Sequence, residues 1–277
     1  MKLCVRNTYL DLSFTRVMGI LNVTPDSFYD GGRHNTSSDI LGYVSKMIKE
    51  GASIIDIGGE STRPGAEEIS LQEELERVIP VVEDIAKRFS VWISVNTSKS
   101  TVIHEAARAG AHMINDIRSL TKPDALDAAV QTGLVICLVH MQGEPCNMQH
   151  APYYNNIVSE VDEYFTIQIS RCKEAGIKEN NLLLDPGFGF GKDLHHNYEL
   201  LANLKYFHRF KIPILIGISR KSMVSRLLEI KTSQSLTGSL SCAVIAAMQK
   251  VHIIRVHDVK ETIEALCIVK ATQIAKG

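Results

Sequence analysis

Short apolar runs that end on a polar or charged residue recur eight times along this chain. Such runs are typical of buried parallel strands, because both faces of the sheet are covered and the strand consists almost entirely of valine, isoleucine and leucine. Amphipathic, helix-like stretches separate the runs, and this alternation is the pattern of a (β/α)8 TIM barrel. The runs are Val17–Asn22, Ser53–Glu60, Val91–Asn96, Met113–Asp116, Val135–His140, Leu182–Asp185, Pro213–Arg220 and Ile253–His257.

The length of the chain suits one such barrel. A TIM barrel has about 250 residues, and the chain has 277. No linker, charge block or low-complexity segment marks a domain boundary, so we expect residues 1–277 to form a single α/β domain. Helices are expected over residues 37–50, 70–88, 238–248 and 259–275. The second begins with a capping-box pattern, Ser70 followed by Glu73, and the third, rich in small residues, should be well buried.

Charge and cysteine usage limit the classes of partner and compartment. Basic and acidic residues nearly balance, at 30 and 31, and they are mixed along the chain. This balance argues against nucleic-acid or membrane-surface binding, and no stretch approaches the roughly 20 apolar residues of a membrane span. The six cysteines are scattered without metal-ligand spacing, which favours reduced thiols in a cytoplasmic protein.

Polar residues at the ends of the runs should meet in space. In a (β/α)8 barrel the carboxyl ends of the strands and the loops that follow them form the active site. The residues that we expect at this mouth are Asn22, Thr62, Arg63, Asn96, Asn115, His140, Asp185, Lys221, Arg255 and His257, together with the aromatic residues Phe28 and Phe190.

The segment Asp185–Lys192, with the sequence DPGFGFGK, is the densest motif. Its spacing matches neither a P-loop nor a dinucleotide-binding fingerprint. Three alternating glycines after a strand indicate a backbone that passes close to another group or turns with positive φ. Asp185 would then accept hydrogen bonds from a ligand with several N–H donors, or alternatively cap a tight turn.

Cations near the last two strands suggest an anionic ligand. Ser219–Ser222, with the sequence SRKS, places two cations and a hydroxyl at the expected start of a helix, where anions are favoured. Arg255 and His257 are two residues apart in a strand, so their side chains point to the same side. The alternatives are a solvated helix start and a salt bridge from the strand to a neighbouring acid such as Asp258.

Three further residues have two interpretations each. Arg63 lies in a polar loop and is either a solvated charge or a clamp that closes over an anion. Asn22, with Asp26, could ligate Mg²⁺ through oxygen, or it could form hydrogen bonds at the end of its strand. His140 lies at the mouth, although a single histidine is more often structural. Taken together, these groups fit a transferase that acts on a planar, N–H-rich molecule bearing phosphate, and they do not fit a covalent hydrolase.

At this point the motifs resemble those of a known family. The segments MGILNVTPDSFYDGG, DIGGESTRPGA, INDI, DPGFGFGK, GISRKS and IIRVHDV are similar to those of dihydropteroate synthase, in particular the bacterial enzymes of folate biosynthesis. They occur in the family's order from about residue 17 to residue 259. The resemblance implies an enzyme that joins (7,8-dihydropterin-6-yl)methyl diphosphate to 4-aminobenzoate and releases diphosphate. It also implies a Mg²⁺ cofactor, competition by sulfonamides and a homodimer.

The resemblance also implies roles for individual residues. Asn115, Asp185 and Lys221 would hold the pterin, with Arg255 packed over it. Asn22 would ligate Mg²⁺ at the diphosphate, which Arg255 and His257 would hold. The residues implied around the aminobenzoate are Thr62, Arg63, Pro64, Phe28, Phe190 and Ser222. Lys221, Arg255, His257 and Asp185 would be the catalytic group, acting without a protein nucleophile.

One residue departs from the family pattern. In the segment SVNTSK the family has an aspartate that faces the pterin, and this chain has Asn96. An asparagine has the same shape but no charge, and one end of its amide is a donor. Loss of a charge-assisted hydrogen bond costs about 1–3 kcal/mol, so we expect a slower but still active enzyme.

Two rival functions share part of this site. A pterin-binding methyltransferase that serves a corrinoid would use the pterin-holding asparagine and aspartate, but it has less need of the STRPG loop, the SRK segment and the Arg255–His257 pair. A non-catalytic pterin-binding paralogue would explain Asn96 as a sign of decay, although the rest of the mouth is intact. A methyl-donor assay would identify the first rival, and pterin binding without turnover the second.

Overall fold

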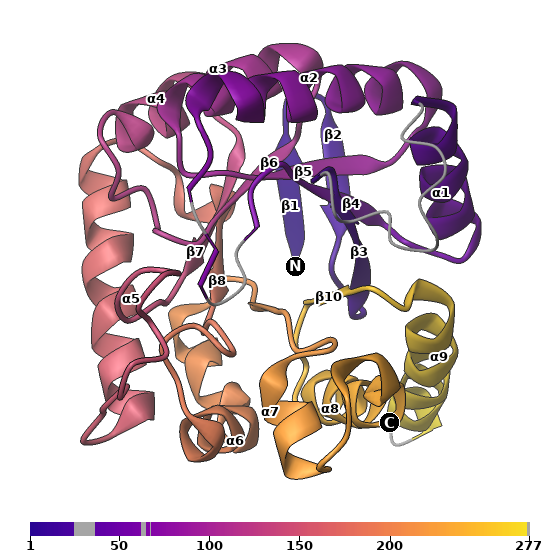
Figure 1. Ribbon diagram of the computed structural model, residues 1–277, viewed down its shortest axis with the longest axis vertical. Coiled ribbons are helices and arrows are strands. Elements are labelled where there is room, and N and C mark those ends of the chain that lie inside the picture. Colours follow the sequence, from indigo (N-terminus) through magenta and orange to yellow (C-terminus); the bar gives the residue numbers. More distant parts are fainter. Residues whose placement is uncertain (25–36, 62–64, 67, 276–277) are drawn as a thin grey trace.

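The computed structural model describes residues 1–24, 37–61, 65–66 and 68–275 (Figure 1). Eight parallel strands form a barrel, and helices surround it as a ring. The strands are β3 (Arg16–Asn22), β4 (Ile54–Gly58), β5 (Trp92–Asn96), β6 (Met113–Asp116), β7 (Val135–Val139), β8 (Leu182–Asp185), β9 (Leu215–Ile216) and β10 (Ile253–Val256). The helices are α1 (Ser37–Lys49), α2 (Leu71–Arg88), α3 (Ser100–Ala109), α4 (Ala125–Thr132), α5 (Ile157–Glu174), α6 (Leu194–Ala202), α7 (Ser222–Leu227), α8 (Leu236–Met248) and α9 (Val259–Ala275). The described residues also form three short 3₁₀ helices, η1 (Glu179–Asn181), η2 (Leu204–Phe210) and η3 (Thr232–Gln234).

The strand order confirms the predicted fold class. Neighbours in the sheet follow the order β8-β7-β6-β5-β4-β3-β10-β9, and every pairing is parallel. A single bridge between Leu184 and Ile214 joins the two edges, supported by the hydrogen bond from the Leu184 N–H to the Pro213 carbonyl at 3.0 Å. The chain therefore folds as a (β/α)8 barrel whose strand ends share one mouth.

The seventh strand is shorter than predicted. The apolar run Pro213–Arg220 contributes only Leu215 and Ile216 to β9. Pro213 has no N–H to donate to the ladder, and Arg220 has a left-handed backbone with φ of 55°. The residues after Ile216 therefore leave the sheet and form the segment that leads into α7.

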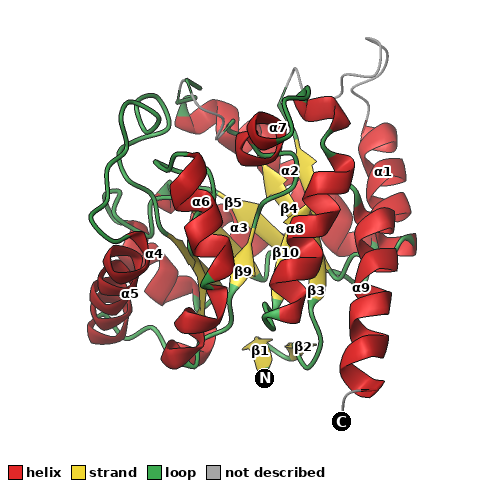
Figure 2. Cartoon of the chain, turned by 90° about the horizontal axis from the view of Figure 1, so that it is seen from below, coloured by secondary structure: helices red, strands yellow, loops and turns green. Residues whose placement is uncertain are grey.

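A two-stranded hairpin at the N-terminus was not predicted. Strands β1 (Lys2–Val5) and β2 (Thr8–Asp11) pair antiparallel, and Figure 2 shows them at the end of the barrel opposite α7. Leu3 is fully buried and Val5 and Leu10 nearly so, whereas Cys4 is exposed. The hairpin therefore covers the lower end of the barrel with apolar side chains.

Two of the predicted helices differ in detail from expectation. At the start of α2 the Ser70 hydroxyl accepts the Glu73 N–H at 3.2 Å, but the Glu73 carboxylate pairs with Arg77, so only half of the capping box forms. Helix α8 is buried on one side only, since Ile245 and Met248 are about half exposed, at 45% and 51%. No described helix is long and apolar enough to cross a membrane.

The hairpin should contribute measurably to stability. We expect Leu3→Ala to lower the free energy of unfolding by about 2–5 kcal/mol, because it leaves a cavity in a fully buried position. Urea denaturation measures this loss. Cys4→Ala, on the exposed side of the same strand, is the control and should change stability by less than about 0.5 kcal/mol. Equal effects of the two substitutions would contradict the role given to the hairpin.

Candidate active site

The mouth of the barrel brings most of the expected residues together. In register, Asn22 lies beside Gly58, Gly58 beside Asn96, and Asn96 beside Asn115. Neighbouring residues in register point to the same side of a sheet, so these three amides line one wall. The opposite wall carries Asp185 from the end of β8 and Arg255 from β10.

The central contact of the site is an ion pair that the sequence did not indicate. The Arg255 Nε donates to Asp56 Oδ2 at 2.6 Å, and the Asn115 amide nitrogen lies 3.4 Å from the same oxygen. Asp56 is fully buried in β4, within the run SIIDIGGE. A charged residue inside an apolar run was the available signal, since such a residue is almost never buried without a partner.

Three buried polar atoms near this pair have no partner among the described residues. They are Asp56 Oδ1, Asn115 Oδ1 and Ser94 Oγ, from the adjacent strands β4, β6 and β5. A buried polar atom without a hydrogen bond is costly and calls for a ligand or an ordered water. Two of the three can only accept, so the wall is suited to a ligand that presents N–H donors.

Asp185 begins the glycine-rich loop, as the sequence predicts. Its Oδ1 accepts the Gly187 N–H at 2.8 Å, which caps the turn. Gly187 and Gly191 have positive φ and lie against backbone: a Cβ would be 1.8 Å from the His140 carbonyl oxygen or 2.3 Å from that of Gln142. The glycines therefore permit both a left-handed backbone and close approach.

A buried lysine holds this loop in place. The Lys192 Nζ lies 2.8 Å from His140 Nδ1, and it donates to the carbonyls of Gly187 and Phe190 at 2.9 and 3.0 Å. Burial lowers the pKa values of both Lys192 and His140. His140, packed edge-on against Tyr164, lies under the loop and supports it, which agrees with the structural alternative for this histidine.

Lys221 lies above the floor of the site. Its Nζ is 4.1 Å from the centre of the Phe190 ring, and it immediately precedes α7, which starts at Ser222. Burial and the nearby Arg255 lower the pKa of Lys221 to about 8. Burial raises the pKa of Asp185 to about 6, against the opposing effects of the Gly187 N–H and Lys221. Ser222 is exposed.

His257 and Arg255 have different neighbours. The Ser219 Oγ lies 3.1 Å from His257 Nδ1 and accepts the His257 N–H at 3.2 Å, so the end of β10 is tied to the segment after β9. The acid next to them, Asp258, pairs with Arg220. The alternative of a salt bridge from Arg255 to a neighbouring acid is therefore realised with a different partner, Asp56.

Asn22 is half-buried, and its amide oxygen faces Gly58, where an added Cβ would lie 3.6 Å from it. The described residues contain no cluster of three or more histidine, cysteine, aspartate or glutamate side chains that could hold a metal ion. Several expected site residues lie outside the described residues: Asp26, Phe28, Thr62, Arg63 and Pro64.

A second charged cluster borders the amide wall and was also missed. The Lys99 ammonium donates to Glu60 at 2.8 Å and to the buried Glu74 at 2.6 Å. Arg118 pairs with Glu144 at 2.7 Å. A narrow cleft runs between this cluster and Asn96. Its members are far apart in sequence, so no local motif reveals them.

Comparison with known proteins decides the family. Residues 18–257 match the model of a family described as pterin binding enzymes. A dihydropteroate synthase of Escherichia coli K12 is 63% identical over 276 residues, which cover 100% of this chain and 98% of that protein. The chain belongs to the dihydropteroate synthase family. Another member, from Haemophilus influenzae, is 50% identical over 272 residues, covering 98% of this chain and 99% of that protein.

Solved structures of dihydropteroate synthases agree in fold. A Yersinia pestis enzyme in complex with a sulfonamide drug has a TM-score of 0.95 and 61% identity, covering 99% of both chains. A Xanthomonas albilineans enzyme with 4-aminobenzoic acid has a TM-score of 0.93 and 41% identity, covering 98% of both. This chain accordingly has the activity of a dihydropteroate synthase, which is a transferase. The matches favour that interpretation over the corrinoid methyltransferase.

The pKa values of two site residues predict a bell-shaped pH profile. Asp185 must be ionised to accept from a ligand, so kcat/KM should rise as pH increases through about 6; Lys221 must be protonated to act as a cation, so kcat/KM should fall through about 8. Steady-state kinetics across pH 5–9 measures both limbs. The residual activity of Asp185→Asn should lose the acid limb, and that of Lys221→Met the alkaline limb. Limbs that persist in these variants would assign the titrations to other groups.

Proposed function

We propose that this chain joins (7,8-dihydropterin-6-yl)methyl diphosphate to 4-aminobenzoate at the mouth of the barrel, giving 7,8-dihydropteroate and diphosphate for folate biosynthesis. The observation that carries this proposal is one composite site. Unpaired buried acceptors on one wall suit a planar N–H donor, and the half-buried cations Lys221 and Arg255 beside them suit an anion.

The pterin would lie between the two walls. Asp185 and Asn115 would accept its N–H groups, and Lys221 would donate to its acceptor atoms, with Asn96 also lining the pocket. Arg255 would pack over the ring, since its guanidinium is held at the centre of the mouth by Asp56. Arginine suits this position because its planar group stacks on aromatic faces while staying charged.

The diphosphate and the aminobenzoate would occupy the upper part of the mouth. Arg255 and His257 would hold the diphosphate, both at the end of β10. Phe190 and Ser222 would border the aminobenzoate, together with Thr62, Arg63, Pro64 and Phe28. Sulfonamides, which resemble 4-aminobenzoate in shape, would compete for this place, as the drug complex of the Yersinia pestis relative suggests.

The reaction needs no protein nucleophile. The bond between the pterin methylene carbon and the diphosphate oxygen breaks first, and the electron pair leaves with the diphosphate. Arg255 and His257 stabilise this developing charge, and the pterin-holding groups keep the delocalised cation in place. The aniline nitrogen then bonds to the methylene carbon and loses a proton. Exclusion of water protects the cation during this interval.

Asn22 fits a magnesium site of the kind that substrate phosphates complete. Mg²⁺ usually takes one or two protein oxygens and several from phosphates and water, and Gly58 places no side chain against the Asn22 amide oxygen. When bound, Mg²⁺ would take up negative charge on the diphosphate.

Removal of the Asn22 amide should raise the Mg²⁺ requirement. In Asn22→Ala we expect the half-saturating Mg²⁺ concentration to increase about tenfold or more, because the variant loses its protein ligand. Titration of Mg²⁺ in a diphosphate-release assay measures this shift. Thr24→Ala, two residues further along, is the control. An unchanged Mg²⁺ requirement in Asn22→Ala would exclude Asn22 as the ligand.

Restoring the family's aspartate should accelerate the reaction. Asn96 is 8% exposed on the amide wall, where a carboxylate would accept from the pterin and stabilise its cation. The gain of about 1–3 kcal/mol in charge-assisted bonding corresponds to a rise in kcat/KM of about 10- to 100-fold in Asn96→Asp. An unchanged kcat/KM would show that position 96 does not limit catalysis here.

The same assay tests the function itself. Purified protein is supplied with the pterin diphosphate and Mg²⁺, with and without 4-aminobenzoate, and diphosphate release is followed. Release that depends on 4-aminobenzoate supports the proposal. Release by Asn96→Asp alone would indicate a barrel disabled at one residue, and silence from both proteins would contradict the proposed activity.

A second copy of this chain is the proposed macromolecular partner. Exposed apolar side chains lie on the neighbouring helices α7, α8 and α9 or just beyond their ends; they are Leu227, Leu228, Ile245, Met248, Ile268 and Ile274. Burial of such side chains in a homodimer would remove them from water, and light scattering would give the mass of two chains.

The free thiols of all six cysteines suit the reducing cytoplasm.

A further inference from the structure

Arg220 links the segment before α7 to the end of β10, and the proposed chemistry does not use it. It precedes Lys221, and its guanidinium forms two hydrogen bonds with the Asp258 carboxylate, at 3.0 Å from Nε and 2.5 Å from Nη2. Asp258 in turn follows His257. The pair therefore connects the residue before one expected ligand-binding side chain to the residue after another.

The backbone of Arg220 is strained. Its φ of 55° lies in the left-handed region that favours glycine. Two contacts keep it there: the bidentate pair with Asp258, and the hydrogen bond from the Arg220 N–H to the Ser239 hydroxyl at 2.9 Å. Strain of this kind persists only where the surroundings hold the residue in place.

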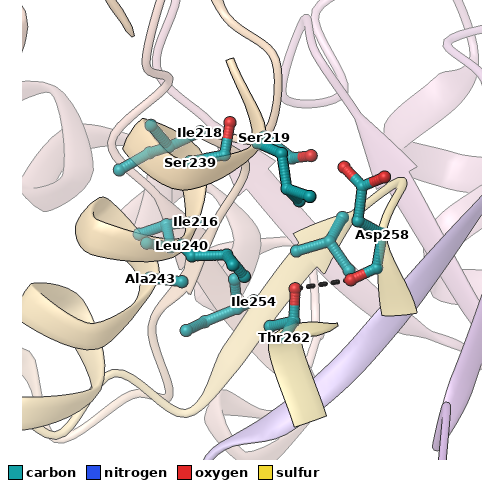
Figure 3. A pocket seen from close by; sticks show the side chains of 11 residues that line it. Ile216, Ile218, Ser219, Ser239, Leu240, Ala243, Ile254, Asp258 and Thr262 are labelled. Carbon is teal, nitrogen blue, oxygen red and sulfur yellow. Dashed lines mark hydrogen bonds between the residues drawn. The ribbon is translucent and has the colours of Figure 1, made fainter. Parts of the chain in front are cut away.

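The segment between β9 and α7 borders a small apolar pocket. A narrow pocket with room for about one water molecule lies between β9, β10, α8 and α9 and is lined in part by Ser219 and Asp258 (Figure 3). Ile216, Ile218, Leu240 and Ile254 form much of its wall. The segment is therefore packed against apolar side chains, and the left-handed turn at Arg220 is held by the polar contacts of that residue.

Asp258 is itself firmly anchored. Its carbonyl accepts the N–H of the buried Thr262 at 3.2 Å and its hydroxyl at 2.7 Å, the second of which is drawn in Figure 3. These contacts fix Asp258 to the first turn of α9. The ion pair with Arg220 thus fastens a strained segment to the start of α9.

We propose that Arg220 is a positioning residue for the reaction. Through its pair with Asp258, it holds the left-handed turn that directs Lys221 toward Asp185 and keeps Ser219 against His257. Arg220 acts through this geometry and not by touching the substrate. The inference rests on the proposed roles of Lys221 and His257.

Comparison of alanine and glycine at position 220 tests the proposal. Both remove the guanidinium, but alanine leaves a Cβ that opposes positive φ, whereas glycine adopts this backbone without strain. We expect kcat/KM for the pterin diphosphate to fall about 10- to 100-fold in Arg220→Ala, since a displacement of about 1 Å costs this much. In Arg220→Gly the fall should be less than about fivefold, and Asp258→Asn should be impaired in the same direction as Arg220→Ala.

A direct contact between Arg220 and the substrate predicts a different set of results. Arg220→Ala and Arg220→Gly would then be equally impaired, and Asp258→Asn would keep wild-type activity because the guanidinium would remain. That outcome would overturn the proposal. So would wild-type kcat/KM in Arg220→Ala.

Two measurements separate positioning from general loss of stability. Thermal unfolding of each variant should shift Tm by less than about 4 °C, and an activity loss that merely follows a larger fall in Tm would also overturn the proposal. Lys250→Ala is the matched control, since Lys250 is exposed, has φ of 63° and lies in the loop before β10, at the opposite end of the barrel. If the wild-type protein itself released no diphosphate, the proposed function would fail, and not the role of Arg220.

Discussion

Charges that have been taken out of water together govern this site. The mouth of the barrel holds the buried Asp56, Asp185 and Lys192 together with the half-buried Lys221 and Arg255. An isolated charge here would be prohibitively costly, so each must contact groups of opposite sign or hydrogen-bonding backbone. The ion pair of Asp56 and Arg255 meets this demand at the centre, and the carbonyls of the glycine-rich loop meet it for Lys192.

Burial of Asp185 suits this carboxylate to ligand binding but lowers the stability of the fold. Its pKa is raised from 3.8 to about 6, so the ionised form is less favourable in the folded protein than in the unfolded chain. The penalty is absent below the unfolded pKa and is complete above about pH 6. At neutral pH the folded protein therefore contains a buried, ionised carboxylate that lowers its stability. A ligand that donates N–H groups to this carboxylate would offset the free-energy cost of burying it. Part of the binding free energy at such a site comes from removing the cost of this buried charge in the unliganded protein.

The sequence reveals the fold and the mouth, but not the partners within it. The strand runs, the positive-φ glycines and the placement of Asp185 and Arg255 at strand ends follow from local pattern, because periodicity and chain direction determine which end of a strand a residue occupies. Which acidic side chain pairs with which basic side chain depends on the tertiary structure. Arg255 could have paired with Asp258, three residues away, yet it pairs with Asp56, 199 residues away. The N-terminal hairpin was missed for a different reason, since its two strands are buried at only some of their positions and lack the continuous apolar run that marks the barrel strands.

The barrel is unevenly closed. Seven of its neighbouring strand pairs share a ladder, while β8 and the segment leading into β9 meet through one bridge, Leu184 with Ile214. Asp185 lies on one side of this seam and Lys221 on the other. A pterin held by both residues would supply, through its own hydrogen bonds, the connection that the backbone lacks. The substrate would then act as a removable rung of the barrel, and the seam would be tightest when the site is filled and loosest when product has left.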